Sequence, residues 1–178
     1  MGNWNRTRGF SLIEMITTLS VLAVVTAVTV PSYVSSHKAA LVESKATQLL
    51  SMLEIGQSES IKRHSIIYVH YVPVTEAKNG CIGLSTKSDV GDFSCTASEG
   101  LQKFIIESGG SVTVQEPEIT SAEKLFYFSP KNGLPSVDKT VKLAKGSETG
   151  NESGILIRRY SGLKGCSNTT VTGWEACS

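Results

Sequence analysis

An apolar segment near the amino terminus constrains this chain more than any other feature. It runs from Phe10 to Val30 as FSLIEMITTLSVLAVVTAVTV and carries a single charge, at Glu14. Folded as a helix it would be about 31 Å long, which matches the hydrocarbon thickness of a bilayer. The nine residues before it hold two arginines and no acid, so the positive-inside rule keeps the amino end cytoplasmic. We therefore predict one membrane span, with everything after Pro31 exported.

A cleavable secretory signal peptide is the alternative for this segment, but the apolar stretch is long for one and no A-x-A site ends it. Glu14 also needs an explanation, because a carboxylate costs about 2.5–3.5 kcal/mol at the centre of a membrane helix and less near an end. A cut between Gly9 and Phe10 would create an α-amine about 6 Å along the helix axis from Glu14. That amine could pair with Glu14 of the same chain or of a neighbouring copy.

The stretch from Arg8 to Glu14, RGFSLIE, followed by the apolar run, resembles the class III signal of type IV prepilins and type II secretion pseudopilins. The resemblance implies that prepilin peptidase removes residues 1–9 by cutting after Gly9 and that Phe10 becomes N-methylated. It also implies that Glu14 aids docking in the filament and that Pro31 matches the proline that kinks the family's long helix. The implied partners are other pilins or pseudopilins, the peptidase and an inner-membrane assembly platform.

The helical pattern continues beyond the apolar segment. Val42, Ala46, Leu49 and Leu53 are spaced i, i+4, i+7 and i+11, which places them on one helix face. We expect residues 10–30 to form a transmembrane and filament-core helix and residues 31–63 to continue that helix onto a β-rich head, residues 64–178. Gly56 is a weak position within the helix, costing about 1 kcal/mol relative to alanine.

After Arg63 the sequence changes to short runs rich in β-branched and aromatic residues, separated by glycine-containing turns. One long helix covering an antiparallel sheet is the simplest arrangement of these segments, so we predict an α+β, pilin-like fold. The predicted strands are Ile66–Val74, Lys103–Ile106, Ser111–Gln115, Leu125–Phe128, Thr140–Leu143 and Gly154–Tyr160.

The carboxyl half is similar to the GspH/FimT branch of these proteins. Leu125–Gly133, LFYFSPKNG, has the branch's hydrophobic strand and Pro-x-x-Gly turn, and the Gly154–Ile157 strand leads on to Gly162. The helix departs from the branch, because Ile55-Gly56 stands about where an Ala-Arg pair is common. The resemblance implies a minor pilin or pseudopilin that primes or caps filament assembly.

Charge leaves DNA binding open as a second function. The net charge of +1 gives no reason to expect the chain as a whole to attract DNA. The charges are unevenly distributed, however: residues 131–164 carry seven basic and three acidic side chains, whereas residues 76–123 carry three lysines and eight acids. FimT-like DNA-uptake pilins use a Gly-Arg-x-Arg loop, and Gly162–Gly165 lacks both arginines. Arg158, Arg159 and Lys164 are the candidate DNA contacts. An ordinary solvated basic face is the alternative.

The four cysteines are exported in this scheme and therefore oxidisable. Three pairings are open, and we favour Cys81 with Cys95 and Cys166 with Cys177, because local loops close most easily. A metal site that includes His64 or His70 is a weaker alternative.

Catalytic motifs such as G-x-S-x-G, H-E-x-x-H and the P-loop are absent from the sequence, so we expect no enzyme, no cofactor and no metal. Three classes of function remain: a filament subunit, a DNA receptor of the same architecture that acts in natural transformation, and an unrelated membrane-tethered periplasmic domain or enzyme. The first two predict a bacterial inner-membrane protein with a single span and a periplasmic head, which becomes extracellular in a pilus.

Overall fold

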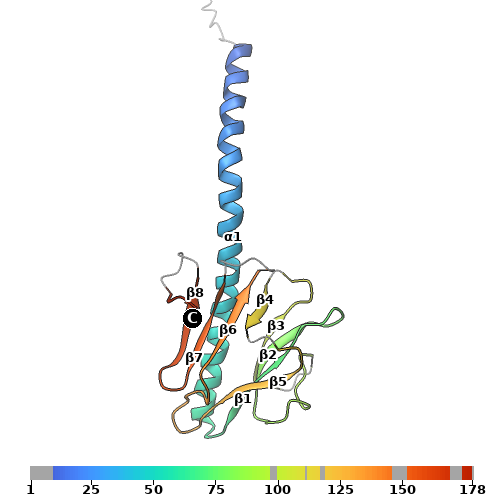
Figure 1. The fold of residues 1–178 in the computed structure, drawn as a ribbon, viewed down its shortest axis with the longest axis vertical. Coiled ribbons are helices and arrows are strands. Elements are labelled where there is room, and N and C mark those ends of the chain that lie inside the picture. Colours follow the sequence, from blue (N-terminus) through green and yellow to red (C-terminus); the bar gives the residue numbers. More distant parts are fainter. Residues whose placement is uncertain are drawn as a thin grey trace, which may run out of the picture. The chain divides into compact units, whose positions relative to one another are not determined.

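The computed structural model describes residues 10–96, 100–110, 112–116, 119–145, 152–168 and 174–177 (Figure 1). The chain divides into two compact units, residues 1–37 and 38–178, and the single helix found in the described residues contributes to both. Eight strands follow it within the second unit. The elements are α1 (Leu12–Lys62), β1 (Ile67–Val72), β2 (Gly80–Ser85), β3 (Gln102–Ile106), β4 (Thr113–Glu116), β5 (Glu123–Phe128), β6 (Lys139–Ala144), β7 (Ser153–Arg158) and β8 (Gly162–Ser167).

The strands form two four-stranded antiparallel sheets, with the orders β3-β2-β1-β5 and β4-β6-β7-β8 (Figure 1). The predicted α+β class is thus confirmed, while the single sheet of the prediction is wrong. Each sheet contains one strand that the sequence did not indicate, β2 or β8. β2 lies between the predicted strands β1 and β3 and pairs with both. β8 pairs with the predicted strand β7 and ends the second sheet.

The second half of α1 supplies the centre of the core in the second unit. Val42, Ala46 and Leu49 are fully buried and Leu53 nearly so, as the predicted stripe requires. They share one cluster with buried side chains of both sheets, including Ile82, Phe128 and Ile155. The helix therefore organises both sheets through a single apolar face.

Gly56 lies where α1 packs closely against side chains of the first sheet. A Cβ atom at this position would lie 2.8 Å from Leu84 Cδ2 and 3.1 Å from Phe128 Cε2, both in fully buried side chains. The glycine therefore lowers helix propensity at a point where a larger residue would overpack the core.

His64 ends the helix in the left-handed region, with φ of 50°. The Ser65 N–H donates to Ser60 O and the His64 N–H donates to Ile61 O, which is a Schellman arrangement with histidine in place of the usual glycine. One turn earlier, Arg63 Nε lies 2.6 Å from Glu59 Oε2, and this hydrogen bond lowers the pKa of Glu59. The helix thus stops at Lys62, one residue before the predicted end.

The predicted strand from Gly154 to Tyr160 ends early in the structure. β7 stops at Arg158, and residues 159–161 form the turn to β8. Gly162 follows with φ of 83°, a value that favours glycine, and its carbonyl and amide begin the next strand. The segment that we predicted as one strand therefore includes the tip of a β-hairpin.

Candidate functional site

The amino-terminal part of α1 begins immediately after the predicted cleavage position. Gly9 and the rest of the predicted leader lie outside the described residues, and Phe10 and Ser11 precede the helix. The Met15 N–H donates to Ser11 O at 3.2 Å, so Ser11 is the N-cap residue. A cut after Gly9 would leave the new α-amine two residues before the first helical turn.

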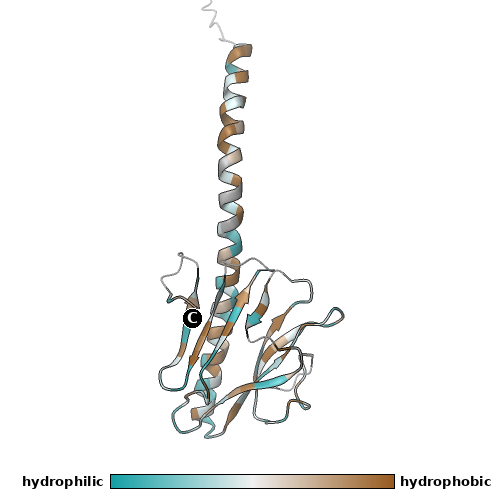
Figure 2. Ribbon diagram, viewed as in Figure 1, coloured by the Kyte–Doolittle hydropathy of each residue, from teal (hydrophilic) through white to brown (hydrophobic). Residues whose placement is uncertain are grey.

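Large apolar residues are frequent in this part of α1 (Figure 2), and their spacing distributes them around the whole helix. Between positions 10 and 30, eleven of them are at least 51% exposed. A helix that is apolar all round is normally buried, either in a protein core or in lipid. These residues are Phe10, Leu12, Ile13, Met15, Ile16, Leu19, Val21, Leu22, Val24, Val25 and Val30.

The hydroxyl groups in the same segment are already hydrogen-bonded to the helix itself. Thr17 Oγ1 donates to Glu14 O at 3.0 Å, Ser20 Oγ donates to Ile16 O at 2.8 Å, and Thr18, Thr26 and Thr29 make equivalent bonds. These donors need no water, so they add little cost when the helix is buried.

Within the described part of the chain, no helix has the length and apolar character needed to cross a bilayer. The span predicted from Phe10 to Val30 is not confirmed by this structure.

Glu14 lies in the first turn of α1 and is exposed. A carboxylate at this end of a helix interacts favourably with the helix dipole. Among the described residues before His37 it is the only charged side chain.

Pro31 lies inside α1, which continues through it. Because proline has no N–H, the carbonyl of Ala27 lacks its usual helical donor.

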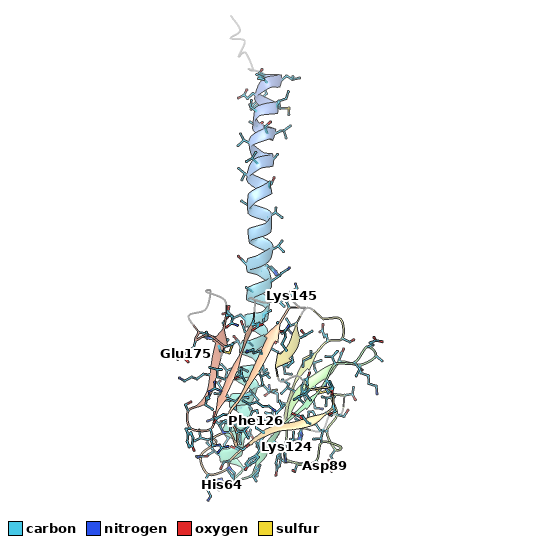
Figure 3. The ribbon with its side chains drawn as sticks, viewed as in Figure 1. His64, Asp89, Lys124, Phe126, Lys145 and Glu175 are labelled. Carbon is cyan, nitrogen blue, oxygen red and sulfur yellow. A yellow bond between two sulfur atoms is a disulfide. The ribbon has the colours of Figure 1, made fainter. Side chains whose placement is uncertain are left out.

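Both disulfides predicted from local loop closure are present: Cys81 pairs with Cys95 and Cys166 with Cys177. The second one holds the carboxyl-terminal residues against β8. The Ser167 N–H donates to the carbonyl of Glu175, which forms a parallel bridge with Cys166 and is labelled in Figure 3.

The predicted DNA contacts lie in the β7–β8 hairpin, but the structure brings only two of them to its tip. Arg158 ends β7, and Arg159 and Tyr160 form the turn, where Tyr160 is 86% exposed. Lys164 lies further along β8, opposite Leu156, and its Nζ is 3.9 Å from Glu175 Oε1.

Asp138 also lies at this tip. From the sequence we included it only in the charge count of residues 131–164. Asp138 Oδ1 accepts a 2.7 Å hydrogen bond from the Arg159 N–H. The carboxylate thereby holds the backbone of the turn in place, but it also reduces the positive charge there. Tyr160, which we predicted as the last residue of a strand, is the exposed aromatic group at this tip.

The histidines of the metal alternative have other contacts in the structure. His64 Nδ1 is 2.7 Å from Ile61 O at the end of α1, and His70 Nε2 is 3.0 Å from Lys87 O while its ring stacks on Phe93. Across the residues with assigned positions, no group of three or more His, Cys, Asp or Glu side chains could hold a metal ion.

One comparison with known proteins gives a match. The family model described as the prokaryotic N-terminal methylation motif matches residues 4–30. No curated protein and no solved structure matches the chain. The match covers the segment that holds Gly9, Phe10 and Glu14, and it stops just before Pro31.

Proposed function

We propose that this type IV pilin-like protein is a minor subunit of a type IV pilus or of a type II secretion pseudopilus, where it primes or caps the filament. The chain carries the N-terminal methylation motif, which implies processing by prepilin peptidase and assembly with other pilins. The observation that carries the proposal is the uncovered apolar helix within the segment that matches this motif. Such a surface needs other helices or lipid around it.

In the proposed mechanism the helix moves from the inner membrane into a bundle of pilin helices. This exchange replaces lipid contacts with helix contacts, so the hydrophobic effect provides little driving force. Close packing and specific electrostatic pairing must therefore select the bundle. Cleavage after Gly9 supplies an amine at Phe10, and Glu14 is the only carboxylate in the described part of the segment that can pair with it.

The turn after β5 supports a minor-subunit role of the GspH/FimT type. In the Ser129–Gly133 turn the Gly133 N–H donates to Ser129 O at 2.8 Å, and Gly133 has φ of 68°. A Cβ atom at Gly133 would lie 2.8 Å from Ile61 Cδ1, so this glycine lets the turn pack directly on α1. The Pro-x-x-Gly pattern thus has a structural purpose in this chain.

N-terminal sequencing of the protein from cells with and without prepilin peptidase tests the proposal. We expect the mature chain to begin with N-methylated Phe10 in peptidase-positive cells and to keep residues 1–9 when the peptidase gene is deleted. A chain in assembled filaments that still begins with Met1 would contradict the proposal and would favour a membrane-tethered domain.

DNA uptake is a second candidate function, and the exposed tip of the β7–β8 hairpin favours it. Arg158 and Arg159 can contact phosphates, while Tyr160 offers an exposed ring on which a base can stack. The same molecule could serve in a pilus that takes up DNA, since the hairpin and the apolar helix belong to different units.

Replacing Arg158 and Arg159 together with alanine should weaken DNA binding if this second function is correct. The loss of two phosphate contacts should reduce the slope of log K against log salt by about 2 in magnitude. Fluorescence anisotropy of labelled duplex over a salt series measures both quantities. The control is Lys78→Ala with Lys124→Ala, which removes the same charge from another part of the head. Equal affinities for the two double variants would eliminate the DNA function.

A further inference from the structure

The end of the second unit where α1 stops is built from three segments: the last turn of α1, the turn after β5 and the tip of the β7–β8 hairpin. His64, which follows α1, marks this end in Figure 3. The turn after β5 joins the other two segments. Its Gly133 packs against Ile61 Cδ1 of α1, and its Leu134 Cδ2 would lie 4.0 Å from a Cβ atom at Gly162 of the hairpin.

Five basic side chains and two acids lie on these segments or directly beside them, which leaves three positive charges. The five are Lys62, Arg63, Lys131, Arg158 and Arg159. Glu59 pairs with the two cations at the end of α1, and Asp138 accepts the Arg159 N–H. In the described part of the chain, no carboxylate other than Glu59 forms a salt bridge with any of the five. Lys87 and Asp92 line a hollow together with Arg63, but they pair with each other at 3.7 Å and add no net charge.

Two exposed apolar side chains lie among these cations. Ile61 is 44% exposed and directly precedes Lys62, and Tyr160 is 86% exposed and directly follows Arg159. Tyrosine is enriched where proteins meet the membrane–water interface, because its ring is apolar and its hydroxyl is polar. Exposed apolar side chains next to clustered cations are typical of surfaces that bind anionic lipids. We call the five cations with Ile61 and Tyr160 the helix-end surface.

Duplex DNA matches only part of the helix-end surface. Its phosphates can contact the cations, but its outside consists of phosphates and sugars and offers Ile61 no apolar layer. An anionic bilayer offers both chemistries, since its phosphates lie at the surface and its acyl chains lie directly below them. The combination of charge and exposed apolar area therefore favours a lipid surface as the partner.

We propose that the helix-end surface binds the headgroup layer of an anionic lipid bilayer. The five cations contact the headgroup phosphates, while Ile61 and Tyr160 enter the boundary with the acyl chains. The bond from the Arg159 N–H to Asp138 and the packing of Gly133 on α1 fix these segments before binding, which reduces the entropy lost. This inference goes beyond the proposed function, because it concerns the second unit whether or not the chain is part of a filament.

Vesicle flotation of the full mature chain tests the proposal. The chain is placed in zwitterionic nanodiscs, whose lipids cover the apolar part of α1, and empty nanodiscs serve as the blank. We expect binding to vesicles with about a quarter phosphatidylglycerol to be at least about tenfold tighter than binding to pure phosphatidylcholine, and to weaken as the salt concentration rises. Equal binding to the two kinds of vesicle, or no binding to either, overturns the inference. The proposed filament function would stand in that case, because N-terminal sequencing tests it separately.

Two double variants test whether the helix-end surface is the binding site. Lys62→Gln with Lys131→Gln removes two cations that the DNA hypothesis does not use, and we expect binding to the anionic vesicles to weaken at least about tenfold. The control is Lys78→Gln with Lys145→Gln, which removes the same charge elsewhere. Lys145 lies at the opposite end of the second unit from His64 (Figure 3). Equal binding of the two double variants overturns the assignment.

A matched pair of single variants separates a lipid partner from DNA. Ile61→Ser removes an exposed apolar side chain from the surface, and Ile55→Ser makes the same change on α1 at a residue that is 43% exposed. We expect Ile61→Ser to weaken vesicle binding about fivefold and Ile55→Ser to have little effect, with similar Tm values for both. Equal vesicle binding of the two variants would contradict the entry of Ile61 into lipid and overturn the proposal. Binding to labelled duplex DNA in the absence of vesicle binding would assign the surface to nucleic acid and overturn it as well.

Discussion

Replacing Glu14 with alanine should reduce incorporation into filaments tenfold or more while leaving the amount of membrane-associated protein unchanged. Two opposite unit charges 4 Å apart interact by about 4 kcal/mol at an effective dielectric constant of 20. About 1.4 kcal/mol is enough for a tenfold change in an equilibrium. The proposed pair between Glu14 and the amine of Phe10 would therefore need to provide only a third of that value. Membrane association depends on the apolar side chains around it, which the substitution leaves in place.

The measurement compares the filament fraction with the membrane fraction by quantitative immunoblot. Glu54→Ala is the control, because it removes an exposed acid from the same helix within the second unit. N-terminal sequencing of both variants checks that leader removal is normal. Incorporation of the Glu14 variant at the wild-type level would show that the carboxylate does not direct assembly.

The helix was predictable because its signals are local. The RGFSLIE stretch lies within seven residues, and the buried face of Val42, Ala46, Leu49 and Leu53 follows from helix periodicity alone. The disulfides were predictable for a similar reason, since each joins cysteines less than fifteen residues apart. The match to the methylation motif covers this same local region.

The strands β2 and β8 were not predictable, because each contains glycines that weaken the strand pattern. In both cases a distant side chain explains a glycine: Phe93 packs at Gly83, and a Cβ atom at Gly165 would lie 2.7 Å from the indole of Trp174. A strand pattern depends on neighbouring residues, so it cannot show the distant aromatic side chain that packs at each glycine. Because these two strands were missed, we predicted one sheet where the structure has two.

The basic hairpin shows the corresponding limit for the candidate site. A charge sum over residues 131–164 gives every charged side chain the same weight, whether or not it lies at the tip of the hairpin. Lys164, Asp138 and Arg158 therefore contribute regardless of their positions. The structure places Glu175 near Lys164 and Asp138 under the turn, so fewer positive charges are exposed together than the sum indicates.

Gly154 is the position where we expect one substitution to destabilise the head most. It lies on β7 opposite Lys142 of β6. A Cβ atom at Gly154 would collide with the backbone carbonyl oxygen of Val141 and lie 3.0 Å from the Cα atom of Lys142. These are backbone atoms within the β6–β7 ladder, so relief requires the two strands to separate. Overpacking that side chains alone can relieve costs about 1–3 kcal/mol, so a backbone collision should reach or exceed the upper value.

Gly154→Ala should therefore lower the free energy of unfolding by about 3 kcal/mol or more, which corresponds to a fall in Tm of roughly 6–12 °C for a chain of this size. Gly91→Ala is the control, because the nearest atom to a Cβ there is Asp89 Oδ1 at 3.4 Å, an ordinary contact in an exposed loop, and its cost should stay within about 0.5 kcal/mol. Thermal unfolding of the full mature chain followed by circular dichroism measures both. Similar Tm values for the two variants would mean that the β6–β7 ladder is looser than this structure places it, because only a movable Val141 carbonyl could accommodate the added methyl group.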